Sequence, residues 1–136
     1  MTEAHYLKYI YRKQVEEGSK IKIKSLADFF QVKPPSVTEM LQKLDDQGFL
    51  NYERYHCVEF TEQGHRIVQK LLRRHRLLET LLIDFLNLNS YEACEEASKI
   101  DFYASEQLTN SICQIYGHPE NCVHGRMIYK DEKCCE

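Results

Sequence analysis

The sequence predicts a mostly α-helical fold with a small β wing. Three observations lead to this fold class. Apolar residues recur with the helical period along most of the chain, prolines and glycines divide its first half into short elements, and only two short runs have the character of strands. At 136 residues the chain can form one domain or two small ones around a modest core. We expect two domains, residues 1–74 and residues 75–136.

The first expected helix covers residues 2–17 and ends at Gly18. One face of this helix is apolar and consists of Tyr6, Leu7, Ile10, Tyr11 and Val15. A short helix over residues 25–30 follows, with Ser25 as its N-cap.

Pro34 and Pro35 predict a turn, because proline removes a backbone donor and restricts the residue before it. A further helix starts near Pro35 and ends at Gly48. Its apolar residues are spaced i, i+3, i+4, i+7, at Val37, Met40, Leu41 and Leu44. Two strand-like runs, 49–53 and 57–61, are then joined across residues 54–56.

This order of elements is typical of a winged helix-turn-helix, which places the polar face of one helix in a DNA major groove and a wing beside it. The residues expected to contact DNA lie on that polar face and in the wing, and are Pro35, Ser36, Thr38, Glu39, Gln42, Lys43 and Arg54. Double-stranded DNA is therefore the expected partner. The alternative is a winged helix that contacts only protein.

Charge is divided unevenly along the chain. The net charge is −3, but residues 1–76 hold 14 basic and 10 acidic residues, whereas residues 77–136 hold 4 and 11. The basic half contains the helix-turn-helix, and the acidic half contains five of the six cysteines. This segregation predicts a DNA-facing half and a half that binds cations or assembles.

The second half begins with a long helix, from a cap at Thr61 towards Asn87. Its apolar stripe consists of Ile67, Val68, Leu71, Leu72, Leu78, Leu81, Leu82 and Phe85. Helices over residues 90–101 and 105–116 follow, and an irregular tail starts at Gly117. These helices bury too little alone, so we expect them to form the interface of a homodimer, which also suits paired half-sites in DNA.

Metal-capable residues occur at helical spacing in this half. His75 and Glu79 share one face of the long helix, and Cys94, Ser98 and Asp101 share one face of the next. An imidazole and a carboxylate at this spacing can bind one metal ion. The alternatives are a surface ion pair and, for Cys94, a small core residue. Further candidates are His5 on the polar side of the first helix and, in the tail, His118, Cys122 and His124.

The chain resembles the diphtheria-toxin-repressor family of metal-dependent transcriptional regulators over residues 2–125. The segments that carry the resemblance are Tyr6-Leu7-x-x-Ile10-Tyr11, Pro35-Ser36-Val37-Thr38, Gly48-Phe49-Leu50, Thr61-x-x-Gly64, Arg74-His75-Arg76-Leu77-Leu78-Glu79 and His118-Pro119-x-x-Cys122-x-His124-Gly125. The resemblance implies a metal-activated dimer that represses metal-uptake genes. We expect the short form, without the SH3-like domain of longer members.

The resemblance also implies a ligand set. His75 and Glu79 match the family's ligands on the linker helix, and Cys94, His5 and Asp101 fall at positions where members have ligands. Ser98 and Phe102 depart from the family pattern, since each stands at a ligand position. This departure predicts that the family's second metal site is lost here or rebuilt from other residues. Cys122 and His124 are the expected substitutes. In the wing, His56-Cys57 replaces an Arg-Gly pair of some members.

Imidazole with a thiolate favours Fe²⁺, Co²⁺, Ni²⁺ or Zn²⁺ over Mn²⁺, and abundance in the cell makes Fe²⁺ the expected ion. In this interpretation a metal held by His5 and by residues of the acidic half stabilises the arrangement that binds DNA.

The main alternative is a metal-independent winged-helix regulator that senses redox through Cys57, Cys134 and Cys135. Another alternative is a metal-binding or protein-interaction module that has lost DNA binding. We expect no enzyme and no small organic substrate, because the chain has neither a Gly-rich phosphate loop nor an H-E-x-x-H pattern. We expect a cytoplasmic protein, because no apolar run is long enough to span a membrane. Its cysteines should be reduced, and irregular spacing without C-x-x-C argues against a zinc finger.

Overall fold

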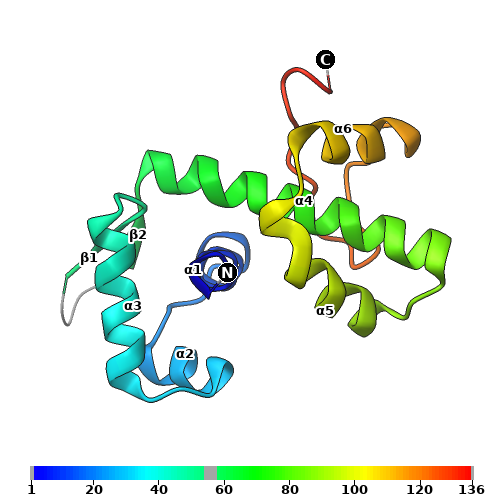
Figure 1. The fold of residues 1–136 in the computed structure, drawn as a ribbon. Coiled ribbons are helices and arrows are strands. Elements are labelled where there is room, and N and C mark those ends of the chain that lie inside the picture. Colours follow the sequence, from blue (N-terminus) through cyan, green and yellow to red (C-terminus); the bar gives the residue numbers. More distant parts are fainter. Residues whose placement is uncertain (1, 54–57, 136) are drawn as a thin grey trace. The chain divides into compact units, whose positions relative to one another are not determined.

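The computed structural model describes residues 2–53 and 58–135, and it divides into two compact units, residues 2–68 and residues 69–135 (Figure 1). The expectations for Arg54, His56 and Cys57 therefore lie outside the described residues. The described chain is mostly helical with one two-stranded sheet, which confirms the predicted fold class. None of its described helices combines the length and the apolar character needed to cross a membrane.

The first unit opens with α1 (Thr2–Tyr11), which passes directly into a π-helical turn, Arg12–Glu16. The prediction of one regular helix to residue 17 was thus wrong in its last part. Val15 is 43% exposed rather than part of a buried face, because the wider turn changes the direction of the following side chains.

Helices α2 (Ile23–Phe30) and α3 (Pro34–Asp46) form the helix-turn-helix. Ser25 is not the N-cap of α2, because the helix begins two residues earlier and Lys22 occupies the cap position. The turn between the helices has Gln31 in the left-handed region, at φ 54°. The core of this unit includes Ile10, Leu26, Val37, Leu41, Leu44 and Leu50.

The wing consists of β1 (Leu50–Tyr52) and β2 (Val58–Phe60), paired antiparallel with Leu50 opposite Phe60. The strands lie beside α3 in Figure 1. The Thr61 hydroxyl accepts a hydrogen bond from the Gly64 N–H at 2.9 Å, which confirms Thr61 as the cap of α4. A Cβ on Gly64 would lie 2.0 Å from the Phe49 carbonyl oxygen, so only glycine permits this close approach.

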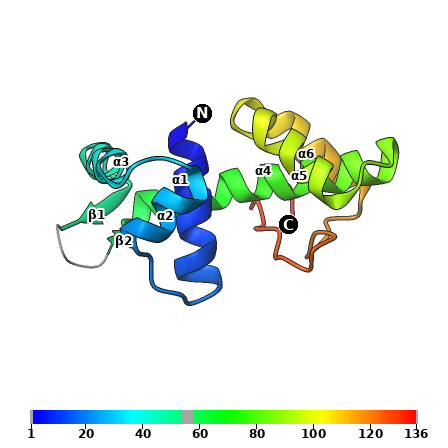
Figure 2. The ribbon, with the colours of Figure 1, turned by 90° about the horizontal axis from the view of Figure 1, so that it is seen from below.

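The second unit contains most of α4 (Glu62–Leu86), then α5 (Ser90–Ile100), a 3₁₀ turn (Asp101–Tyr103), α6 (Glu106–Ile115) and an irregular tail. Figure 2 shows α5 and α6 next to the C-terminal half of α4. Their shared core consists of Leu77, Leu78, Ala97, Ala104, Ile112, Cys113, Cys122 and Ile128. Phe85, predicted to continue the apolar stripe of α4, is instead 64% exposed.

Candidate functional site

Two side chains of α4 begin the site. His75 and Glu79 are one helical turn apart and therefore lie on the same face. Both are buried, at 8% and 3% exposure, and His75 Nε2 lies 2.7 Å from Glu79 Oε1. Their spacing on a single helix thus brings an imidazole and a carboxylate together away from water.

Helix α5 adds a thiol to this pair. A capping box fixes the start of α5, because the Asn89 side chain accepts from the Glu92 N–H and the Glu92 carboxylate accepts from the Asn89 N–H. Cys94 then lies in the second turn, with its Sγ 3.5 Å from His75 Nε2. One potential ligand atom from each of His75, Glu79 and Cys94 lies within 4.8 Å of the others.

Asp101 lies behind the histidine. Its side chain is fully buried, and its Oδ2 is 2.9 Å from His75 Nδ1. A carboxylate that accepts from one ring nitrogen fixes the imidazole and leaves the other nitrogen free for a metal ion. The family resemblance implies that Asp101 is a direct metal ligand, whereas this contact supports an orienting role.

The tail brings a second imidazole to the same carboxylate. His124 Nδ1 lies 3.0 Å from Glu79 Oε2. That oxygen is buried, and although the imidazole lies close enough for an ion pair, Oε2 accepts no hydrogen bond of good geometry among the described residues. A buried carboxylate oxygen without a full hydrogen bond is costly, and a bound cation would relieve that cost. The imidazole of His75, the carboxylate of Glu79 and the thiol of Cys94 lie together and form a donor set suited to divalent transition metals, so these three residues fit such an ion.

The electrostatics of the site fit the same conclusion. Burial alone would lower the pKa of His75, but hydrogen bonds to Asp101, Cys94 and Glu79 outweigh it and raise the pKa to about 10. Burial would raise the pKa of Glu79, yet the His75 hydrogen bond and charge, with His124 and Arg126, lower it. The cluster thus stabilises positive charge at its centre.

The remaining predicted ligands lie elsewhere. Cys122 is 7% exposed and belongs to the hydrophobic core of the second unit. Ser98 is half-buried on α5, one turn after Cys94. His5 is half-buried on α1, in the first unit. Their roles as ligands stay predictions.

The polar face of α3 is largely open. Side chains of Pro35, Ser36, Glu39, Gln42 and Lys43 are exposed, as expected for residues that meet DNA. Thr38 is half-buried, and its hydroxyl donates to the Pro34 carbonyl at 3.3 Å.

Neighbouring side chains engage two of the polar residues of α3. The Gln42 amide donates to Asp46 at 3.1 Å, and the Lys43 ammonium pairs with the Glu3 carboxylate of α1. The base-reading and phosphate-binding roles of this helix stay predictions.

Two consecutive segments of the chain match the models of known protein domains. Residues 2–58 match the model of the N-terminal DNA-binding domain of the iron-dependent repressors, and residues 61–130 match that of their metal-binding and dimerisation domain. The chain belongs to the iron-dependent repressor family. These two matches confirm the resemblance drawn from the sequence.

Known regulators and solved structures are similar to the chain over more than half of its length. An uncharacterised HTH-type transcriptional regulator of Methanocaldococcus jannaschii is 36% identical over 76% of this chain and 82% of its own. The HTH-type transcriptional regulator MntR of Bacillus subtilis is 39% identical over 57% of this chain and 54% of its own. The structure of a manganese-dependent transcriptional repressor with manganese superposes with a TM-score of 0.85 at 31% identity, over 96% of this chain and 59% of that one.

Two features of this member of the iron-dependent repressor family escaped sequence reasoning. The contact of Asp101 with His75 depends on the 3₁₀ turn that follows α5, and no periodic pattern signals such a turn. The contact of His124 with Glu79 depends on the path of the irregular tail. The only available signal was the density of His and Cys between residues 118 and 124.

Proposed function

We propose that the protein is a metal-activated transcriptional repressor that binds operator DNA as a homodimer in the cytoplasm and controls metal-uptake genes. The observation that carries this proposal is the match of both family domains, one for DNA binding and one for metal binding and dimerisation, to consecutive parts of the chain. In the active repressor the metal ion would be held by His75, Glu79, Cys94 and His124, with Asp101 behind His75.

The expected metal is Fe²⁺. Several related structures are those of proteins named as manganese regulators, and one structure of ScaR contains Zn²⁺. Mn²⁺ prefers carboxylate and carbonyl oxygens, whereas the cluster in this chain offers two imidazoles, a thiol and one carboxylate. This softer donor set supports iron over manganese, with Zn²⁺, Co²⁺ and Ni²⁺ as the other candidates.

The metal-binding residues come from three separate segments, α4, α5 and the tail. Glu79 and a Cys94 thiolate would hold a divalent cation whose charge offsets theirs, and shared ligation would tie these segments to one another. Because α4 begins in the first unit and ends in the second, stabilising its C-terminal half favours one conformation of a helix that both units share. His5 is the predicted ligand from the first unit.

DNA binding is assigned to α3. Ser36, Thr38 and Glu39 lie near its N-terminal end, where side chains of a recognition helix meet base edges, and Lys43 lies a turn further on, where phosphates are contacted. This arrangement requires no catalytic chemistry and no organic substrate.

The test starts from protein purified without oxygen. Duplexes enriched from a random pool by the Fe²⁺-loaded protein are titrated by fluorescence anisotropy with Fe²⁺, Mn²⁺, Zn²⁺ or chelator, and a further arm replaces metal by a mild oxidant. We expect tight binding only with metal, and its loss in His75→Ala. Retention of binding in His65→Ala, another histidine of α4, is the control.

Equal affinity in metal and chelator would overturn the proposal. A response to oxidant alone would instead establish the redox-sensing alternative.

A further inference from the structure

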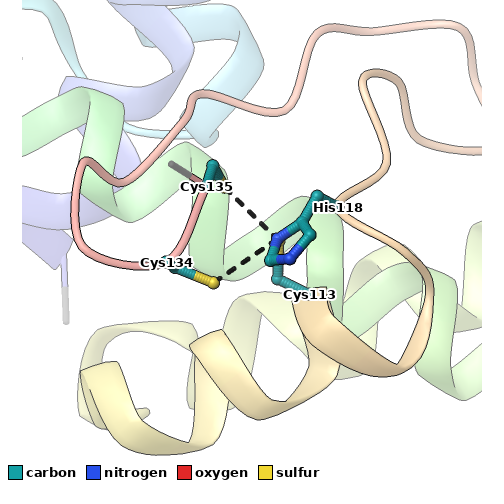
Figure 3. A group of neighbouring side chains, drawn as sticks. All are labelled: Cys113, His118, Cys134 and Cys135. Carbon is teal, nitrogen blue, oxygen red and sulfur yellow. Dashed lines mark hydrogen bonds between the residues drawn. The ribbon is translucent and has the colours of Figure 1, made fainter.

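Four other metal-capable side chains gather beside the C-terminal end of α6. They are Cys113, His118, Cys134 and Cys135, drawn in Figure 3, and one potential ligand atom from each lies within 4.8 Å of the other three. They share no residue with the cluster around His75.

We propose that Cys113, His118, Cys134 and Cys135 form a structural zinc site of the Cys₃His class, which fastens the C-terminal tail to α6.

Distances between the donor atoms match those around a tetrahedral zinc ion. With zinc–sulfur bonds of about 2.3 Å and zinc–nitrogen bonds of about 2.0 Å, two sulfurs lie about 3.8 Å apart, and sulfur and nitrogen about 3.5 Å apart. Cys113 Sγ and Cys135 Sγ are 3.7 Å apart, far longer than a disulfide bond. His118 Nδ1 lies 3.3 Å from Cys113 Sγ and 3.7 Å from Cys134 Sγ.

The backbone after α6 returns His118 to Cys113. Gly117 and His118 both have left-handed dihedrals, at φ 69° and 54°, which reverse the chain. The His118 N–H donates to the Cys113 carbonyl at 2.8 Å. A residue other than glycine is uncommon at a positive φ, although histidine is among those that tolerate it, so a ligand role gives a reason for a side chain at this place.

A second turn presents the two adjacent cysteines. The Asp131 carboxylate accepts from the N–H groups of Lys133 and Cys134, at 2.9 and 3.0 Å. The Asp131 carbonyl accepts from the N–H groups of Cys134 and Cys135, at 3.1 and 2.8 Å. Aspartate in this position stabilises a tight turn, so the two thiols are held in place by local backbone geometry.

A buried arginine supplies the matching charge. Zinc with three thiolates and one neutral imidazole has a net charge of −1. The guanidinium of Arg73, 5% exposed, lies 3.8 Å from Cys135 Sγ and also donates to the Asn110 side chain at 3.0 Å. This cation offsets the excess negative charge of the occupied site.

Half of the site lies beyond the segment that defines the family. Cys113 and His118 lie within the matched metal-binding domain, residues 61–130, whereas Cys134 and Cys135 follow its end. Sequence spacing did not reveal the site, because its ligands come from a helix and two turns instead of a C-x-x-C hairpin.

Fastening the tail has a direct effect on the first cluster. The tail between His118 and Cys134 carries His124, whose imidazole lies beside Glu79. Zinc bound by His118 and Cys134 would anchor both ends of this segment, because these two residues are its first and last.

The test uses the full-length protein purified without added metal and treated with a weak chelator. Zinc per chain is measured by elemental analysis in the wild type, in C134S/C135S and in two controls, Cys94→Ser from the first cluster and Cys122→Ala from the hydrophobic core. We expect one retained zinc per chain in the wild type and both controls, and a loss of at least nine-tenths of it in C134S/C135S.

Zinc X-ray absorption on Cys94→Ser adds a readout that does not depend on the folding of the double variant. The expected shell is three sulfurs at about 2.3 Å and one nitrogen, whereas zinc held by the first cluster of that variant would show nitrogen and oxygen only. Full zinc retention in C134S/C135S would overturn the proposal. So would a nitrogen–oxygen shell, or a metal-free protein whose mass shows a disulfide among these cysteines.

Discussion

At the scale of single residues, Asp101 would act on the proposed metal site through His75 and without contacting the ion. Its carboxylate holds His75 Nδ1 at 2.9 Å, and so fixes the direction of Nε2. Asp101→Asn keeps the shape but removes the charge, so we expect metal affinity at the His75 cluster to fall about 10- to 100-fold. Competition with a chromophoric chelator measures this change. The matched control is Asp84→Asn, an exposed aspartate on α4, and equal losses in both variants would contradict an orienting role.

The ion pair between Glu3 and Lys43 gives a pH dependence of stability in the first unit. The hydrogen bond from Lys43 lowers the pKa of Glu3 below its usual 4.5. A carboxyl with a lowered folded pKa stabilises the protein above its unfolded pKa, and this contribution disappears as pH falls through the folded value. The Lys43 side chain is 54% exposed, so we expect Glu3→Gln to lower the free energy of unfolding by only about 0.2–1 kcal/mol near neutral pH.

Urea denaturation of the wild type and Glu3→Gln at neutral and acidic pH measures this contribution. The two proteins should converge as the pH falls below 4.5 and Glu3 becomes protonated. A difference that stays constant across this range would show that the ion pair is not its source.

At the scale of elements, α3 should divide its contacts between bases and phosphates. Lys43→Ala should weaken binding to every duplex and reduce the salt slope by about one, because one fewer counterion is displaced. Glu39→Gln should instead change base preference, by about 1–3 kcal/mol at the contacted position. Binding isotherms at several salt concentrations and with single-base variants of the enriched duplex measure both effects. Glu17→Gln, an exposed glutamate outside α3, is the control, and variants that all bind like the wild type would exclude α3 as the reading helix.

Helical elements with a clear period were predictable from sequence. The expected helix from Thr61 to Asn87 appears as Glu62–Leu86, and the helix expected over residues 105–116 appears as Glu106–Ile115. His75 and Glu79 could be paired in advance because they share a single helix. The π-helical turn at Arg12–Glu16 could not be foreseen, since its wider hydrogen bonding leaves no mark on apolar spacing.

The path of the C-terminal tail could not be predicted either, because it too leaves no periodic pattern in the sequence. Its path depends on the left-handed residues Gly117 and His118, on the turn at Asp131 and on carbonyls that accept from arginines of α4. Each of these features is local and aperiodic. Sequence alone therefore showed a concentration of histidines and cysteines but not which of them meet.

For the whole molecule, the proposed dimer needs an exposed apolar surface. Phe85, Leu86 and Ile115 are 64%, 62% and 69% exposed, and a hydrogen bond of 2.7 Å from the Tyr116 hydroxyl to Asp84 brings the ends of α4 and α6 together. We expect a second copy of the chain to cover these side chains, because an exposed apolar patch commonly marks a protein interface.

Phe85→Glu should therefore weaken the dimer by about 3 kcal/mol or more, roughly 100-fold, because the change occurs twice in a symmetric interface. Light scattering after gel filtration at several concentrations measures this change. Val15→Glu, which alters an exposed apolar residue in the first unit, should leave the dimer intact. An unchanged dimer in Phe85→Glu would place the interface elsewhere.

Two arginines of α4 hold the tail by its backbone. Arg73 donates to the Tyr129 carbonyl at 2.8 Å and Arg76 to the Met127 carbonyl at 2.6 Å, so an aperiodic segment stays folded without a helix or sheet of its own. Segments of this kind open at low free-energy cost once an anchor is lost. Proteases that need a loose chain end would then degrade chains that have lost their ions sooner than loaded ones. The lifetime of the protein in the cell, and with it the amount available to occupy DNA, would follow the metal supply.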